Sequence, residues 1–109
     1  MAIPHANSGQ PIDIRPLGSG LPEARTVALF KTAELEVMRL VLHAGKSFPS
    51  HRVPGEVTIQ CLEGRIEVNV DGQSHILQTG QLLYLSGDVL HSLLGLEDAS
   101  ALVTIALRK

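Results

Sequence analysis

The sequence predicts an all-β fold, a sandwich or barrel formed by a single domain. Short runs rich in β-branched residues and leucine recur from Thr26 onward, about every 8 to 12 residues, with turn-forming residues between them. Helical periodicity is weak throughout. The best helical candidate, residues 32–42, runs directly into Ala44-Gly45 and lies between strand-like runs, so we interpret it as a strand. A length of 109 residues with 44% hydrophobic residues suits one globular domain with one core.

The first 22 residues differ from the rest of the chain. They contain four prolines and three glycines and show no sustained periodicity. We therefore predict an irregular N-terminal arm over residues 1–22, with one short strand at 12–14, and a barrel domain over residues 23–109. Such an arm either lies over the surface of its own domain or pairs with a neighbouring subunit, and the sequence leaves both arrangements open.

The strands of the predicted domain are separated by recognisable turns. Asp71-Gly72 lies between two alternating runs and is typical of a type I′ hairpin turn, because glycine adopts a positive φ without steric cost. In the run before this turn, Ile66, Val68 and Val70 share one face, which indicates a half-buried strand. The strands are expected at residues 26–30, 35–42, 57–62, 66–70, 75–77, 82–85, 90–94 and 101–107.

Charge and composition exclude several classes of partner. The 9 basic and 11 acidic residues give a net charge of −2 without any block of like charge, so we expect no nucleic-acid partner. No apolar run approaches the roughly 20 residues that cross a bilayer, and the N-terminus lacks an export signal, so we expect no membrane partner and a soluble cytoplasmic protein. The single cysteine, Cys61, lies inside an apolar run and is interpreted as a small buried hydrophobe.

Two glycine-framed segments, 45–64 and 80–95, each place a histidine beside a turn at the end of a strand. They resemble the two motifs of the cupin family, Gly-x5-His-x-His-x3–4-Glu-x6-Gly and Gly-x5-Pro-x-Gly-x2-His-x3-Asn. Gly45, His51 and Gly64 match the first motif, and Gly80 and His91 match the second. The resemblance covers about residues 35–107 and implies a jelly-roll β-barrel, commonly assembled as a homodimer.

Many cupins bind one divalent metal ion, such as iron, manganese, nickel or zinc, through two histidines and a glutamate of the first motif and one histidine of the second. By this resemblance, His51 and His91 fall on histidine positions. Val53 replaces the second histidine, and Val57 stands at the glutamate position with Glu56 one residue away. In the second motif, Ser86, Asp88 and Gly95 replace proline, glycine and asparagine.

The sequence leaves two arrangements of Glu56 open. If Pro54-Gly55 forms a bulge, Glu56 turns inward and completes a metal set with His51 and His91. If the strand pattern simply continues, Val57 and the apolar residues that alternate with it fill the core, and Glu56 faces solvent.

Arg39 and Tyr84 are the remaining candidates for ligand binding. Arg39 would anchor an anionic ligand if its face of the strand lines the barrel. Tyr84 lies among leucines and is interpreted as an amphipathic residue at the edge of the core.

Three functions follow from these observations. The first is a small barrel that binds a small molecule in its interior without catalysing a reaction. The second is a metal-dependent enzyme of the dioxygenase or isomerase type with His51 and His91 as metal ligands. The third is a homo-oligomeric interaction module that uses the N-terminal arm.

Overall fold

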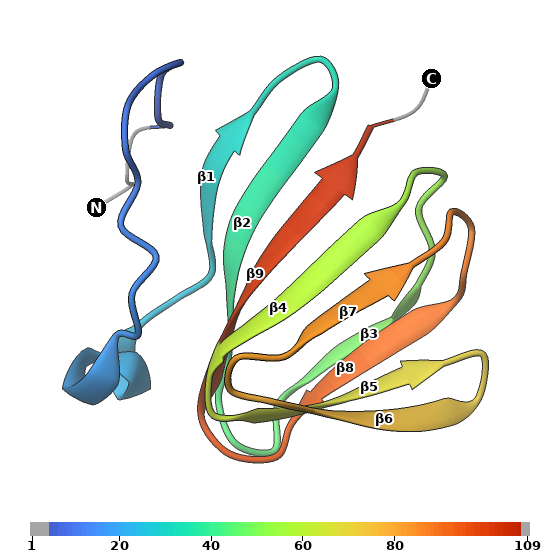
Figure 1. Ribbon diagram of the computed structural model, residues 1–109. Helices are drawn as coiled ribbons and strands as arrows, with labels where there is room; N and C mark the ends of the chain where they lie inside the picture. Colours follow the sequence, from blue (N-terminus) through green and yellow to red (C-terminus); the bar gives the residue numbers. More distant parts are fainter. Residues whose placement is uncertain (1–4, 108–109) are drawn as a thin grey trace.

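The computed structural model describes residues 5–107, and within them the chain forms nine β-strands and one short 3-10 helix (Figure 1). In chain order, these elements are η1 (Gly18–Glu23), β1 (Val27–Lys31), β2 (Leu35–Leu42), β3 (Ser47–His51), β4 (Val57–Glu63), β5 (Arg65–Val70), β6 (Gln73–Gln78), β7 (Leu82–Leu85), β8 (His91–Gly95) and β9 (Ala99–Ala106).

The strands form two antiparallel sheets that face each other as a jelly-roll barrel (Figure 1). One sheet has five strands in the order β1-β2-β9-β4-β7, and the other has four in the order β3-β8-β5-β6. Asp71 and Gly72, both with positive φ, form the tight turn between β5 and β6. The predicted all-β, single-domain jelly-roll barrel is therefore confirmed.

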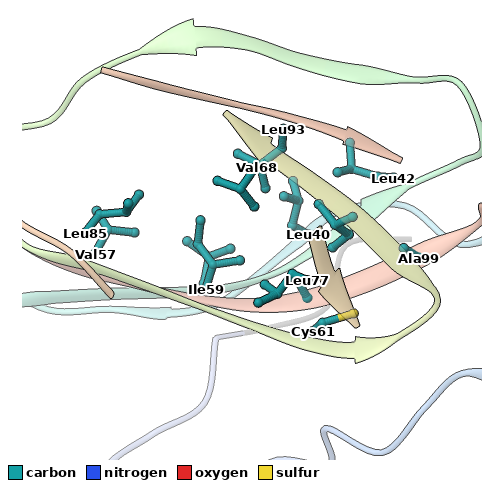
Figure 2. Packing of buried hydrophobic residues seen from close by; sticks show 13 residues of the cluster. Leu40, Leu42, Val57, Ile59, Cys61, Val68, Leu77, Leu85, Leu93 and Ala99 are labelled. Carbon is teal, nitrogen blue, oxygen red and sulfur yellow. The ribbon is translucent and has the colours of Figure 1, made fainter. Parts of the chain in front are cut away.

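The core lies between the two sheets and is built by strand alternation. On β4, Val57, Ile59 and Cys61 point inward, as does Val68 on β5 (Figure 2). Ile66 of β5 belongs to the same buried cluster. All five side chains are almost completely buried, and each fully buried aliphatic side chain contributes roughly 1.5–3 kcal/mol to folding. Burial raises the pKa of the Cys61 thiol, as expected of a cysteine that packs as a hydrophobe.

Two expectations about local structure are wrong. The residues before Val57 contain an additional strand, β3, where we expected only a loop. Its sequence, Ser-Phe-Pro-Ser-His, has few strand-forming residues, but β3 lies at an edge of the four-stranded sheet and pairs on one side only, where proline is tolerated. Residues 12–14 form no strand, because the arm runs beside β1 without ladder pairing there, and the arm ends in η1.

The arm is attached to the outer face of the five-stranded sheet by two polar side chains. The Glu63 carboxylate accepts hydrogen bonds from the backbone N–H groups of Leu17, at 2.9 Å, and Gly18, at 3.1 Å, and from the Ser100 hydroxyl. The Nη2 of Arg39 donates to the carbonyl oxygen of Arg15 at 2.7 Å. The sheet thus holds the backbone of residues 15–18 through side chains that point away from the barrel.

The attachment through Glu63 is expected to depend on pH. Burial alone would raise the pKa of Glu63, but the hydrogen bonds from Leu17, Ser100 and Gly18 and the charge of Arg39 outweigh it and lower this pKa below 4.5. A carboxyl with a lowered folded-state pKa stabilises the fold above its unfolded pKa, and this contribution is lost as the pH falls through the lowered value.

We therefore expect the backbone amides of Leu17 and Gly18 to lose protection from hydrogen exchange below about pH 4.5. Glu63→Gln should lower their protection factors roughly ten-fold at neutral pH, since a hydrogen bond to a charged group contributes ~1.5 kcal/mol or more. Glu67→Gln is the matched control, because Glu67 also accepts a serine hydroxyl, that of Ser74, but does so on the other sheet. If the amides of Leu17 and Gly18 are equally protected in the Glu63 and Glu67 variants, Glu63 does not hold the arm.

Candidate functional site

His51 and His91 lie next to each other on the inner face of the four-stranded sheet. They occupy paired positions on β3 and β8, and their ring centroids are 4.4 Å apart with the planes tilted by 53°. His91 is 4% exposed, whereas His51 is half-buried at the edge strand. The two motif histidines, which lie far apart in the sequence, are therefore brought together.

A β-bulge turns His51 inward. Phe48 pairs with Leu93 and His51 pairs with His91, so two residues of β3, Pro49 and Ser50, stand opposite one residue of β8. In a regular strand, residues 48 and 51 would point to opposite faces. The extra residue removes this alternation, and Phe48 and His51 both face the interior with their rings 5.0 Å apart.

Both imidazoles are held in one tautomer by the same local hydrogen bond. The Nδ1 of His51 lies 3.1 Å from the carbonyl oxygen of Pro49, and the Nδ1 of His91 lies 2.9 Å from that of Val89. Because a carbonyl oxygen only accepts, Nδ1 must carry the proton in both rings. The Nε2 atom of each neutral ring is therefore a hydrogen-bond acceptor or a metal ligand.

The two Nε2 atoms have no hydrogen-bond partner within residues 5–107. In that part of the chain, every fully buried side-chain nitrogen or oxygen has a partner, so both Nε2 atoms keep contact with open space. Beside His51, a cavity of about 50 Å³ extends into the barrel. Its wall consists of apolar side chains of β2, β4, β8 and β9 together with Phe48 and His51. The ring of His91 lies next to that of His51 but does not line this cavity.

The other cupin metal positions are not occupied by ligating side chains. Val57 is part of the buried core, and Val53 packs against that core. Glu56 lies on the surface, where its carboxylate accepts a hydrogen bond from the Tyr84 hydroxyl at 2.6 Å. No group of three histidine, cysteine, aspartate or glutamate side chains within residues 5–107 is arranged to hold a metal ion. The full four-ligand centre of metal-binding cupins therefore does not fit these side chains, and only the two histidines match it.

Arg39 and Tyr84 both point away from the barrel. Arg39 alternates with Met38 and Leu40, which line the interior cavity, so its own side chain lies on the outer face under the arm. Tyr84 is 58% exposed on the edge strand β7, and its hydrogen bond to Glu56, with partial desolvation and the charge of that carboxylate, raises its pKa. Because the face of β2 that carries Arg39 does not line the barrel, Arg39 cannot anchor an anionic ligand in the barrel interior.

The two motif segments also contact each other directly. The backbone N–H of Asp88 donates to the carbonyl oxygen of Val53 at 2.8 Å. Asp88 has a φ of 62°, a left-handed conformation that glycine adopts most readily and that aspartate tolerates better than most residues. The cupin motif has glycine at this position, and glycine is the residue that adopts this conformation at the lowest cost.

Sequence reasoning missed the cavity-lining residues Met38 and Phe48. The sequence did not indicate that Phe48 faces the interior, because residues 47–51 were expected to form a loop and not a strand. Met38 belongs to a predicted strand, but nothing in the sequence indicates which of its two faces lines the barrel interior, since Val37 and Val41 on the opposite face are also apolar and buried.

Comparison with known proteins agrees with this geometry. The sequence pattern of the family described as "Cupin domain" matches residues 38–106, well over half of the chain. A comparison with curated protein sequences finds no match. Within residues 5–107, no helix is both long and apolar enough to span a membrane.

Three solved structures illustrate the similarity of the fold. A conserved protein of unknown function from Streptococcus pyogenes superposes with a TM-score of 0.77 at 17% identity, covering 100% of this chain and 96% of that one. An RmlC-like cupin from Desulfovibrio desulfuricans gives 0.75 at 24% identity, covering 89% and 96% of the two chains. Salicylate 1,2-dioxygenase from Pseudoaminobacter salicylatoxidans gives 0.69 at 17% identity, covering 73% of this chain and 24% of that one. At these identities the solved structures show a shared fold, and the family match over residues 38–106 shows that the chain belongs to the cupin family.

Proposed function

We propose that the barrel binds a small, mostly apolar molecule that donates a hydrogen bond to His51 or His91. The observation that carries this proposal is the pair of imidazoles whose Nδ1 atoms are both engaged with backbone carbonyls while both Nε2 atoms are without a partner. Acceptors of this kind beside an apolar wall favour a ligand with one hydroxyl or similar donor group on a hydrocarbon body.

The size of the cavity limits the ligand. A volume of about 50 Å³ is far below the 300–1,000 Å³ of typical drug-sized sites. A ligand of a few heavy atoms fits with its polar end beside His51. A larger ligand requires the wall to adapt, for which Met38 is suited, because a methionine side chain is unbranched and changes rotamer easily.

A thermal-shift screen tests this function with small alcohols, phenols and short amides. A ligand present at one hundred times its Kd stabilises the native state by ~2.7 kcal/mol, which corresponds to a rise in Tm of roughly 10–20 °C for a domain of this size. We expect at least one such compound to raise the Tm of the wild type and to lose this effect in His51→Ala and His91→Ala. His75→Ala is the control, because His75 is exposed on β6 outside the site.

If no compound shifts the Tm of folded wild-type protein, or if the shifts persist unchanged in both histidine variants, the barrel interior is not the binding site.

A second candidate function is metal binding by the same two histidines, as in a metal-dependent enzyme of the dioxygenase or isomerase type. The engaged Nδ1 atoms support it, because metal-ligating histidines are usually oriented by such a hydrogen bond. Two imidazoles are only part of a metal site. Elemental analysis of the same variants distinguishes the candidates. Near-stoichiometric iron, manganese, nickel or zinc that disappears in both variants but not in His75→Ala favours the metal, and substoichiometric metal unaffected by His51→Ala argues against it.

A further inference from the structure

A second and larger cavity lies outside the barrel, between the N-terminal arm and the outer face of β1 and β2. Its volume is about 860 Å³, within the range of small-molecule sites. The arm is the dark-blue segment that descends beside β1 in Figure 1. We call this space the arm groove. Its charged lining residues are Asp13, Arg15, Glu23, Arg25 and Arg39.

Arg39 is the unusual residue of the arm groove. It is 6% exposed, and its one hydrogen bond within residues 5–107 is the contact from Nη2 to the carbonyl oxygen of Arg15. No carboxylate of the described residues lies within 4.0 Å of its guanidinium, since the ion pairs there are Arg15–Asp13 and Arg65–Glu97. A buried guanidinium normally has a carboxylate or phosphate partner, because burial of an unpaired charge is costly.

The remaining donors of Arg39 are accessible from the arm groove. Every fully buried side-chain nitrogen or oxygen within residues 5–107 has a hydrogen-bond partner. The Nε and Nη1 atoms of Arg39 have none, so they keep accessible surface, and the open space beside them is the arm groove. A planar guanidinium with free N–H groups matches the two oxygens of a carboxylate or phosphate.

The neighbouring charges favour an anion. The carboxylate of Asp13 is occupied by Arg15, with Nη2 at 2.7 Å and Nε at 3.0 Å. The nearby Glu63 carboxylate is occupied by the arm backbone and Ser100. Among the lining residues, the three arginines outnumber the two carboxylates by one. The charges of Asp13 and Glu63 also act on Arg39, but both carboxylates are hydrogen-bonded to other donors.

We propose that the arm groove binds a small organic anion whose carboxylate or phosphate group pairs with the guanidinium of Arg39. This site is separate from the barrel interior, because Arg39 and the cavity-lining Met38 point to opposite faces of β2. The proposal therefore stands whether or not the barrel function proposed above is correct.

Titration of the ¹⁵N-labelled protein with inorganic phosphate and, separately, with malonate tests the site, with sodium chloride holding the ionic strength constant. We expect saturable shifts at the backbone amides of Arg15, Leu17, Gly18 and residues 24–27 with at least one of the two probes. Arg39→Gln should raise the Kd at least ten-fold, and Arg25→Gln should raise it several-fold. Arg65→Gln should leave it unchanged, because Arg65 is an exposed arginine outside the arm groove.

The two probes also identify the chemistry of the ligand, since saturation by phosphate alone indicates a phosphate ester and saturation by malonate alone indicates a carboxylic acid. Absence of saturable shifts with both probes overturns the proposal, as does an equal Kd in the wild type and Arg39→Gln. If Arg39→Gln does not fold, Arg25→Gln decides, and a Kd unchanged by that substitution overturns the proposal as well.

Discussion

Replacing Gly64 by alanine is expected to destabilise the protein by ~3–5 kcal/mol. Gly64 lies in the turn between β4 and β5 with a φ of 79°, where a side chain is strained. A Cβ at this position would lie 2.2 Å from the carbonyl oxygen of Asp98 and 2.8 Å from the Cα of Ala99. Both obstacles are backbone atoms of the segment entering β9, so they cannot move aside as the end of a flexible side chain would. This crowding gives a physical reason for the glycine that closes the first cupin motif.

Substitutions at two further glycines separate the two causes of this loss, backbone strain and crowding. Gly72 has a φ of 84° but no atom within 4 Å of its hypothetical Cβ, so Gly72→Ala measures backbone strain alone and should cost about 1 kcal/mol. Gly55 lacks a positive φ, but its Cβ would lie 1.7 Å from the carbonyl oxygen of Ala106, so Gly55→Ala measures crowding alone. Urea denaturation of the three variants provides the comparison. A loss in Gly64→Ala no larger than that in Gly72→Ala would show that the crowding relaxes freely.

Replacing Ile59 by alanine is the second change with a large expected effect, a loss of ~2–5 kcal/mol of unfolding free energy. Ile59 is 1% exposed on β4, in the centre of the core (Figure 2). Unlike most core residues, it also lines the barrel cavity. The substitution therefore enlarges an existing open space, and an enlarged apolar cavity of this kind can take up a small aromatic molecule.

Ile66→Ala is the matched control for Ile59→Ala. Ile66 has the same side chain and is also fully buried, but it does not line the cavity. Urea denaturation should show comparable losses for both variants. Saturating benzene should then raise the Tm of Ile59→Ala well above its effect on Ile66→Ala and on the wild type. If benzene raises the Tm of the two variants equally, the cavity does not lie beside Ile59.

Most of the fold could be predicted from the sequence because its signals are local. Alternation in β5 and the Asp71-Gly72 turn each involve neighbouring residues, and the structure has them as expected. β3 could not be predicted in this way. It is held as a strand by its pairing with β8, which lies about 40 residues further along the chain, and its own sequence favours a loop.

The candidate site was predictable only in part. The motif positions of His51 and His91 indicated that they would meet, and they do. The direction of Glu56 depends on the backbone path from Pro54 to Val57 and on its partner Tyr84, neither of which is visible in the alternation of the strand. The burial of the Arg39 side chain depends on which face of β2 the arm covers. The roles of these residues as ligands, homodimer formation and the cytoplasmic location stay predictions.

The bulge at Pro49 and Ser50 has a consequence for aggregation. β3 is an edge strand of its sheet, and an edge with free N–H and C=O groups can accept a strand from another molecule. Pro49 has no N–H to donate, and a bulge beside it breaks the regular spacing that an incoming strand would need. The residues that turn His51 toward the interior therefore also make this edge a poor template for intermolecular β-sheet growth.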